Sequence, residues 1–287
     1  MLPILHSADE LLAKYDVVFC DVWGVVHNGV TAYREACAAL ERFRRKGGTV
    51  ALVSNAPRRP ASVEGVLAEK SVPPSCWDVI VSSGGIAVTH AAEKGYGQVY
   101  HLGPDRDLDI FDDTGLERVA IEDCDAILCT GLVDDRRETG EDYRERLIRA
   151  AGRKLPFICA NPDLVVDVGA QRLPCAGAIA AVYEDLGGPV FWAGKPYKSS
   201  YEAAMTSVST WREAAVHKSQ VLAIGDSVRT DMAGAAAFGI DALFIGQGIH
   251  HDTIAPHGAL DAAALADLLA AEADFERMPV AAMMTLC

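Results

Sequence analysis

The sequence predicts an α/β protein that has a Rossmann-like three-layer core with a parallel sheet and an inserted α/β cap domain. Short β-branched runs alternate with amphipathic helical segments, a rhythm typical of parallel sheets covered by helices. The rhythm changes between about residues 97 and 188 and then resumes. Half of the 287 residues are hydrophobic, so two cores can be filled. We therefore predict a core domain from residues 1–90 and 188–287, with residues 91–187 as the cap.

The first core segment has the pattern of three strands separated by helices. Ser7 and Glu10 are spaced as a capping box that would open a short first helix. Leu40 and Phe43 share one face of the next helix, which Gly47 and Gly48 would end. The strands are expected at residues 17–21, 49–53 and 79–81, and the two longer helices at 33–46 and 60–70.

The middle segment is expected to form its own sheet, with strands at residues 99–102, 119–121, 126–129 and 157–159. Its loops carry aspartates at positions 105, 107, 109, 112, 113, 134 and 135. These lack the Asp-x-Asp-x-Asp-Gly spacing of a tight calcium loop, so we interpret them as solvated surface.

The last segment returns to the first rhythm. Strands are expected at 190–192, 221–224 and 242–245, with helices near 200–208 and 231–238, all assigned to the core domain. The apolar stretch 280–287 is expected to pack on the core or on a neighbouring chain.

The charge of the chain limits its partners. The formal net charge is −14, and both nucleic acids and anionic membranes need a basic face, so we expect neither as a partner. A small phosphorylated substrate stays possible because one site can be locally positive. The amino terminus lacks a signal-peptide pattern, and the eight cysteines form neither a CxxC pair nor a metal spacing. These features favour a cytoplasmic protein.

Polar side chains follow four of the expected strands: Asp21, Ser54 with Asn55, Lys195 and Asp226. Ligands of open parallel sheets bind beyond the carboxyl ends of the strands. A single aspartate there is usually a cap, but these four ends together supply a phosphoryl-transfer site. Asp21 would attack phosphorus, Lys195 would neutralise charge, and Asp226 would share Mg²⁺ with Asp21.

These positions resemble the four motifs of the haloacid dehalogenase (HAD) superfamily. The run from Asp21 to Val25 is similar to motif I, and Val53-Ser54-Asn55 to motif II. Gly194-Lys195-Pro196 resembles motif III, and the run from Gly225 to Asp231 resembles motif IV. Their order, with a large cap between motifs II and III, resembles the NagD-like class IIA branch. Asn161-Pro162-Asp163 is similar to a signature in the caps of that branch.

The resemblance implies a Mg²⁺-dependent phosphatase of small, sugar-phosphate-like metabolites, with a possible homodimer. It makes Asp21 the nucleophile and a metal ligand. Ser54, Asn55 and Lys195 would face the phosphate. The metal would also bind Asp226 and the backbone carbonyl of Trp23. Asp231 would support the metal or orient Lys195, although it could instead simply cap the next helix.

Trp23 departs from the family pattern, which normally has a second aspartate two residues after the nucleophile. That aspartate protonates the leaving alcohol and then activates water, and an indole can do neither. A phosphatase is therefore favoured, with a binding or regulatory protein of impaired catalysis as the alternative. A 2-haloacid dehalogenase is less favoured, because further carboxylates near Asp21 would repel a haloacid.

Other polar residues lie near these motifs. His27 or Asp163 could replace the missing acid, since His27 follows Trp23 closely and histidine titrates near neutrality. His27 is expected in a flexible turn. Arg58 and Arg59 are expected to face solvent.

Overall fold

The computed structural model describes residues 2–168, 171–272 and 277–287. The chain divides into two compact units. The first unit contains Met1–Ser54, Glu64–Val81 and Tyr201–Cys287, and the second contains Asn55–Val63 and Ser82–Ser200. The first unit is thus built from both ends of the chain. The boundaries that we expected for a core and a cap stay a prediction.

The first unit contains a six-stranded sheet in the order β13-β12-β11-β1-β2-β3. Its strands are β1 (Val17–Cys20), β2 (Thr49–Ser54), β3 (Val79–Ser82), β11 (Val221–Gly225), β12 (Asp241–Ile245) and β13 (Ala281–Met283). The pairings of β1 with β2 and β11, of β11 with β12, and of β12 with β13 are parallel. The predicted α/β architecture with a Rossmann-like parallel sheet is confirmed.

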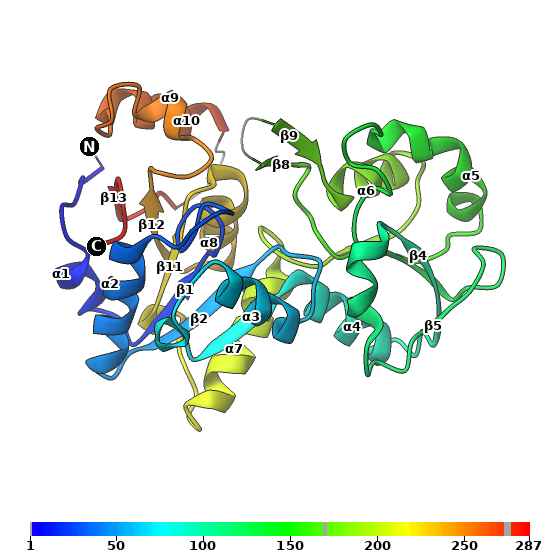
Figure 1. The fold of residues 1–287 in the computed structure, drawn as a ribbon, viewed down its shortest axis with the longest axis horizontal. Helices are drawn as coiled ribbons and strands as arrows, with labels where there is room; N and C mark the ends of the chain where they lie inside the picture. Colours follow the sequence, from blue (N-terminus) through cyan, green and yellow to red (C-terminus); the bar gives the residue numbers. More distant parts are fainter. Residues whose placement is uncertain (1, 169–170, 273–276) are drawn as a thin grey trace. The chain divides into compact units, whose positions relative to one another are not determined.

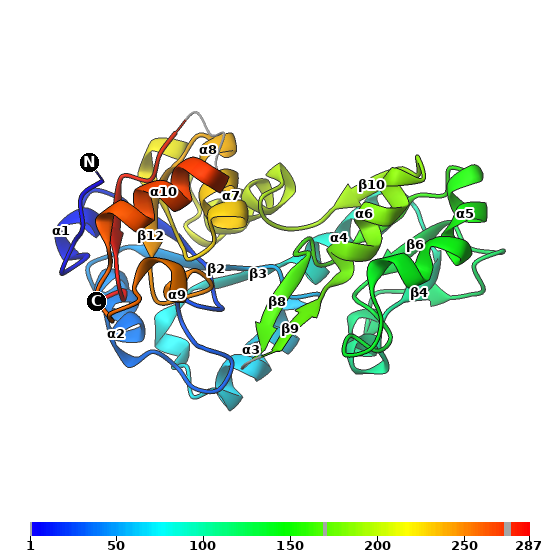
Figure 2. The same ribbon diagram turned by 90° about the horizontal axis from the view of Figure 1, so that it is seen from above.

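Helices lie on both faces of this sheet. In Figure 2, α2 (Arg34–Arg45) is on one side of the sheet and α8 (Ala233–Phe238) is on the other. The apolar face of α2 buries Ala36, Leu40 and Phe43. The remaining helices that enter this unit are α1 (Asp9–Leu12), α3 (Pro60–Glu69), α7 (Lys198–Trp211), α9 (His251–Ile254) and α10 (Ala262–Glu272).

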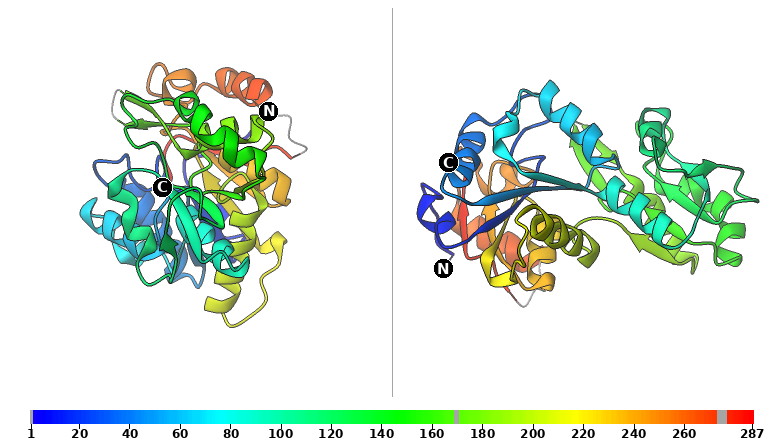
Figure 3. Two further views of the ribbon diagram at one scale, coloured as in Figure 1. Left: turned by 90° about the vertical axis from the view of Figure 1, so that its right-hand side faces the viewer. Right: turned by 90° about the horizontal axis from the view of Figure 1, so that it is seen from below.

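The two ends of the chain meet within this unit. Ile4 forms an isolated parallel bridge with Ala282, and the N–H of Ala8 donates to the carbonyl of Cys287 at 2.8 Å. In Figure 1 and in the right-hand view of Figure 3, the red C-terminal strand β13 accordingly lies near the blue N-terminal segment. Met283 and Leu286 are buried, so the apolar C-terminal stretch packs on the core, one of its two expected positions.

The second unit has a five-stranded parallel sheet in the order β10-β7-β6-β4-β5. Alternate residues of β6 (Ala126–Cys129) and β7 (Phe157–Cys159) enter two different apolar clusters, one on each face. One cluster includes α5 (Arg144–Gly152) and α6 (Ala176–Asp185), and the other includes α4 (Ser83–Glu93). The other strands are β4 (Gln98–Leu102), β5 (Glu117–Arg118) and β10 (Val190–Trp192).

Several expected elements differ from the structure. Strand β10 pairs with β7 and not, as we expected, with the first sheet. The prediction failed because a three-residue apolar run does not specify which strand it pairs with. The strand expected at 119–121 is displaced to β5. The antiparallel pair β8 (Val165–Val168) and β9 (Gln171–Pro174) and the edge strand β13 were not predicted.

The predicted capping box of the first helix is also wrong. The N-cap of α1 is Ala8, and no side chain caps it, although the Ser7 hydroxyl accepts a 3.3 Å hydrogen bond from the N–H of Asp9. Among the residues that the structure describes, no helix combines the length and apolar character that a membrane span needs.

Candidate functional site

The site begins where the central strands of the first sheet end. From β1 the chain continues to β2 on one side, whereas β11 returns on the other side. The carboxyl ends of β1 and β11 therefore form a topological switch point, the usual ligand position in open α/β sheets. Asp21 directly follows β1, and its N–H donates to the carbonyl of Ile224 at 2.8 Å. Asp226 directly follows β11, so both carboxylates lie at one edge.

Three carboxylates converge at this edge. Asp21, Asp226 and Asp231 each offer an oxygen, and these oxygens all lie within 4.8 Å of one another. Asp226 is 4% exposed and Asp231 is 3% exposed, whereas Asp21 is partly exposed. The structure thus brings together the three acidic residues that the sequence analysis selected. Their catalytic roles stay predictions.

The backbone around Asp226 is shaped to admit its carboxylate. A Cβ atom at either Gly24 or Gly248 would overlap Asp226 Oδ2. The N–H of Ile249 donates to the same oxygen at 2.7 Å. Sequence reasoning missed Gly248 and Ile249. The available signal was the Gly-Gln-Gly run at 246–248, because glycines directly after a strand often permit close approach of the backbone.

Asp231 is fixed by the turn that follows β11. Its Oδ2 accepts a 3.1 Å hydrogen bond from the N–H of Ser227, and the hydroxyl of Tyr201 donates to its backbone carbonyl at 3.2 Å. The N-cap of this turn is Ser227, whose hydroxyl accepts from the N–H of Thr230. The simple capping role considered for Asp231 is therefore wrong.

The chemistry of these residues fits a hard divalent cation. Carboxylates so close and so little hydrated repel one another, and a bound cation offsets that repulsion. All three donors are oxygens, the ligands that Mg²⁺ prefers. Two of the carboxylates are already oriented by backbone N–H groups. The acidic cluster can therefore hold Mg²⁺ without a change in side-chain chemistry.

The loop after Asp21 is closely hydrogen-bonded, contrary to the flexible turn that we expected. The N–H of Gly24 donates to the carbonyl of His27, and the N–H of His27 donates to the carbonyl of Val22. The side-chain oxygen of Asn28 accepts hydrogen bonds from the backbone N–H groups of Val30 and Thr31. These bonds fix the backbone on both sides of Trp23.

His27 is unsuited to replace the missing acid. It is 3% exposed, and its Nδ1 accepts a 2.9 Å hydrogen bond from the N–H of Gly29. Burial, with a smaller contribution from the positive charge of Lys70, lowers the pKa of His27 to about 4. The imidazole is therefore neutral at pH 7, and the expectation that it titrates near neutrality is wrong.

In the second unit, the side chain of Asn55 is bound to the backbone of Lys195. Asn55 Oδ1 accepts from the Lys195 N–H at 2.8 Å, and Nδ2 donates to the Lys195 carbonyl at 2.9 Å. Nδ2 also donates to Asp163 Oδ1 at 2.9 Å. The amide thus positions Lys195 and Asp163. Because both its oxygen and its nitrogen take part in these bonds, the amide has little remaining hydrogen-bonding capacity for the phosphate contact that we predicted. That predicted contact remains untested.

Close packing surrounds this connection. Lys195 is 4% exposed, and a Cβ atom at the preceding Gly194 would lie 2.6 Å from Asn55 Oδ1. Gly194 also has φ of +122°, a backbone conformation that favours glycine. In the first unit, Ser54 is the last residue of β2, at the same sheet edge as Asp21. Its phosphate-binding role stays a prediction.

Arg58 and Arg59 were expected to face solvent, but their side chains bind acidic residues or backbone carbonyls of the second unit. Arg58 lies 3.7 Å from a carboxylate oxygen of Asp107 and 3.5 Å from one of Asp109. Arg59 donates to the carbonyl of Asp112. Asp107 is buried, and burial raises its pKa even though Arg58 opposes that shift. These aspartates are therefore partly structural, which corrects the interpretation of the acidic loop as only solvated surface.

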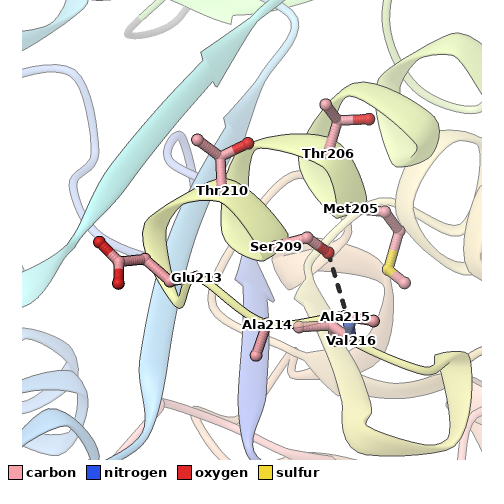
Figure 4. A pocket seen from close by; sticks show the side chains of 8 residues that line it. All are labelled: Met205, Thr206, Ser209, Thr210, Glu213, Ala214, Ala215 and Val216. Atoms are coloured by element: carbon pink, nitrogen blue, oxygen red, sulfur yellow. Dashed lines mark hydrogen bonds between the residues drawn. The ribbon is translucent and has the colours of Figure 1, made fainter.

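An open pocket occurs at the other end of the first unit. In Figure 4 it lies at the end of α7 and in the loop before β11, where the N–H of Val216 donates to Ser209 Oγ. Its lining residues are Met205, Thr206, Ser209, Thr210, Glu213, Ala214, Ala215 and Val216. These residues lie before the amino-terminal end of β11, so the pocket is remote from the carboxyl ends of the strands and from the carboxylates.

Comparisons with known proteins identify the family. Residues 18–117 match the model of the haloacid dehalogenase-like hydrolases, and residues 192–271 match a second model described as HAD-hydrolase-like. A crystal structure of a haloacid dehalogenase-like hydrolase from Brucella suis 1330 is 43% identical. The match covers 99% of this chain and 100% of that one, with a TM-score of 0.84. The chain belongs to the haloacid dehalogenase-like hydrolases. The predicted enzyme class, a hydrolase, is confirmed.

Two further relatives are named for an activity. The 5'-nucleotidase YutF of Bacillus subtilis (strain 168) is 26% identical over 241 residues, which are 83% of this chain and 90% of that protein. The p-nitrophenyl phosphatase from Archaeoglobus fulgidus shares the fold, with a TM-score of 0.72 and 20% identity over 95% of this chain and 97% of that one. These relatives agree with the predicted class IIA branch of HAD phosphatases.

Proposed function

We propose that the protein is a Mg²⁺-dependent phosphatase that cleaves a small phosphorylated metabolite through an aspartyl phosphate at Asp21. One observation carries the proposal: three carboxylates lie within 4.8 Å at the switch point of a HAD-like hydrolase. The activities for which two relatives are named, 5'-nucleotidase and p-nitrophenyl phosphatase, are both phosphomonoester hydrolyses. Phosphoric monoester hydrolysis is thus the reaction that fits this family member.

Asp21, Asp226 and the backbone carbonyl of Trp23 would hold the magnesium ion, with Asp231 as a supporting group. When bound, Mg²⁺ neutralises negative charge on the phosphate so that an anionic nucleophile can approach it. The hydrogen bonds from Ile249 to Asp226 and from Ser227 to Asp231 orient two of these carboxylates beforehand. Such supporting bonds are typical of metal sites.

The reaction has two displacements at phosphorus. A carboxylate oxygen of Asp21 attacks, the bond between phosphorus and the ester oxygen breaks, and the leaving group departs with the electron pair. Water then attacks the aspartyl phosphate, which releases inorganic phosphate and restores the Asp21 carboxylate. Asp21 is partly exposed, so a substrate and then water can reach it.

The remaining predicted residues would act on the phosphate. Ser54 would donate a hydrogen bond to a phosphate oxygen, and Lys195 would neutralise negative charge. Asn55 would position Lys195 through the two hydrogen bonds to its backbone. A sugar-phosphate-like substrate, a homodimer and a cytoplasmic location stay predictions from the sequence.

The acidic cluster disfavours a dehalogenase, because two further carboxylates beside Asp21 would repel a 2-haloacid and the departing halide. The test is a panel of phosphorylated metabolites assayed with Mg²⁺, in parallel with chloride release from 2-haloacids. We expect phosphate release that EDTA abolishes and that Asp21→Asn eliminates. Chloride release that EDTA does not affect would contradict the proposal, and stabilisation by a metabolite without turnover would indicate a binding protein.

A further inference from the structure

An exposed aromatic residue, Trp23, belongs to the loop that packs against Asp226 of the acidic cluster. Trp23 is 40% exposed, an unusual state for a large apolar residue in a buried loop whose residues 24–27 are all buried. It directly precedes Gly24, whose Cα approaches Asp226 so closely that a Cβ would lie 2.6 Å from the carboxylate carbon. The indole therefore belongs to the residue next to the glycine that packs against Asp226, a predicted metal ligand.

The indole ring is held in place by its own loop. The His27 ring contacts it edge to face, with centroids 5.4 Å apart and planes at 72°. The far edge of the ring packs over Gly29, where a Cβ atom would lie 2.5 Å from Cη2 and 2.7 Å from Cζ2. Backbone hydrogen bonds fix the loop on both sides. Exposed but supported from beneath, the ring is a preformed surface for a ligand.

A second exposed apolar residue belongs to another loop that contacts the same carboxylate, the loop between β12 and α9. Ile249 is 41% exposed, and its N–H bonds to Asp226 Oδ2 at 2.7 Å. Trp23 thus precedes the glycine whose backbone packs against Asp226, and the backbone N–H of Ile249 itself binds Asp226. We call these two residues the apolar rim. An apolar rim beside three carboxylates suits a substrate with one anionic end and one flat apolar end.

We propose that the apolar rim binds the leaving group of the substrate, and that this leaving group is a planar aromatic ring bonded directly to the ester oxygen. The proposal rests on the proposed phosphatase function and narrows its substrate class to aryl phosphates. Aromatic rings prefer offset or edge-on contacts with an indole, which an exposed and fixed ring can offer. A sugar would gain less from the same surface.

The chemistry of the first displacement agrees with this choice. When Asp21 attacks, the bond between phosphorus and the aryl oxygen breaks, and the aryl oxide departs with the electron pair. A stabilised aryl oxide needs no proton as it leaves, whereas an alkyl oxide does. The Trp23 N–H supplies no useful acidity, so an aromatic leaving group removes the need for an acid at that position. The departing oxide then takes its proton from water.

The test compares p-nitrophenyl phosphate with acetyl phosphate. Both leaving groups depart without a proton, but only the first is aromatic. We expect Trp23→Leu to raise the ratio of the KM for p-nitrophenyl phosphate to that for acetyl phosphate about 3- to 10-fold, as expected for loss of one aromatic contact. Trp23→Phe should keep most of the preference, and Gly29→Ala should also raise the ratio because it displaces the ring.

Gly47→Ala is the matched control for Gly29→Ala. Gly47 also has a positive φ, +93° against +83° at Gly29, but open space surrounds it, so this variant reproduces the backbone strain without a clash. We expect it to leave the KM ratio unchanged. A ratio unaffected by Trp23→Leu would overturn the proposed aromatic site while leaving the phosphatase function intact.

Binding of unreactive analogues decides the proposal even without turnover. Calorimetry with Mg²⁺ should show that phenylphosphonate binds more tightly than methylphosphonate, and that Trp23→Leu reduces this preference. Equal affinity for the two phosphonates in the unmodified protein would refute an aromatic leaving-group site. If the preference is present but neither phosphate ester is hydrolysed, the proposed phosphatase function fails and the aromatic site stands.

Discussion

Replacing Gly248 by alanine tests how closely the backbone is fitted to Asp226. A Cβ atom at this position would overlap Asp226 Oδ2, which also accepts the 2.7 Å hydrogen bond from Ile249. The φ angle of Gly248 is outside the left-handed region, so alanine adds no backbone strain there. The substitution therefore acts by displacing the carboxylate from its position.

The size of the effect follows from the lost hydrogen bond. A hydrogen bond to a charged group contributes about 1.5–3 kcal/mol, and the displaced carboxylate can no longer accept it from Ile249. Because Mg²⁺ would bind the carboxylate in its original position, the free energy of Mg²⁺ binding is reduced by the energy of this lost hydrogen bond. Each 1.4 kcal/mol corresponds to about a tenfold change. We therefore expect the dissociation constant for Mg²⁺ to rise about 10- to 100-fold, in the range typical of disrupted supporting bonds.

The assay is phosphate release as a function of Mg²⁺ concentration, with calorimetric titration of Mg²⁺ as a second measurement. Gly65→Ala is the control, because nothing lies within 4 Å of a Cβ at Gly65, which is inside helix α3. It should leave Mg²⁺ binding unchanged and slightly stabilise the protein, since alanine favours helices. If Gly248→Ala binds Mg²⁺ like the unmodified protein, Asp226 is not the ligand that we propose.

Three other predictions concern stability. Asn55→Leu should lower the free energy of unfolding by about 2–4 kcal/mol, because it leaves the buried N–H and carbonyl of Lys195 without the Asn55 amide; unchanged urea melts would contradict this. Mg²⁺ at about 100 times its dissociation constant should stabilise the protein by about 2.7 kcal/mol, and thermal melts of Asp226→Asn with and without EDTA should show this gain lost; an equal gain in the variant would exclude Asp226 as a ligand. Burial lowers the pKa of His101, in β4, to about 4. The neutral imidazole therefore contributes fully to the free energy of unfolding above pH 6.5. That contribution is lost as the pH falls toward 4, because the unfolded chain binds the proton at a higher pH than the folded protein does. His101→Gln should therefore reduce acid destabilisation by about 1–2 kcal/mol in melts at pH 7 and pH 4.5, and an unchanged pH dependence would refute that assignment.

The strands of the first sheet other than β13, and the acidic cluster, were predictable because their signals are local. Each central strand is a short apolar run, and two of the three carboxylates directly follow one, as Asp21 follows β1 and Asp226 follows β11. Parallel pairing places such residues at one edge, so the sequence alone brings the carboxylates together. The apolar character of residues 280–287 likewise predicted burial, although not that part of them forms an edge strand.

The rest depends on contacts between distant residues, which a local pattern does not contain. The sheet that β10 joins is decided by its pairing with β7, about thirty residues earlier. The amide of Asn55 binds the backbone of Lys195, 140 residues away, so its positioning role was not apparent. His27 was expected to titrate near neutrality because the sequence gives its type but not its burial. The Gly-Gln-Gly run at 246–248 indicates close backbone approach, but it does not show that Asp226 is the group approached by Gly248.

The central claim is that Asp21 accepts the phosphoryl group. The most direct measurement is acid quenching during turnover of p-nitrophenyl phosphate with Mg²⁺, followed by mass spectrometric mapping of the phosphorylated peptide. We predict a hydroxylamine-sensitive phosphoryl group on Asp21 that forms before phosphate is released, and none in Asp21→Asn. Turnover with no phosphoryl group at residue 21, or undiminished turnover by Asp21→Asn, would contradict the account.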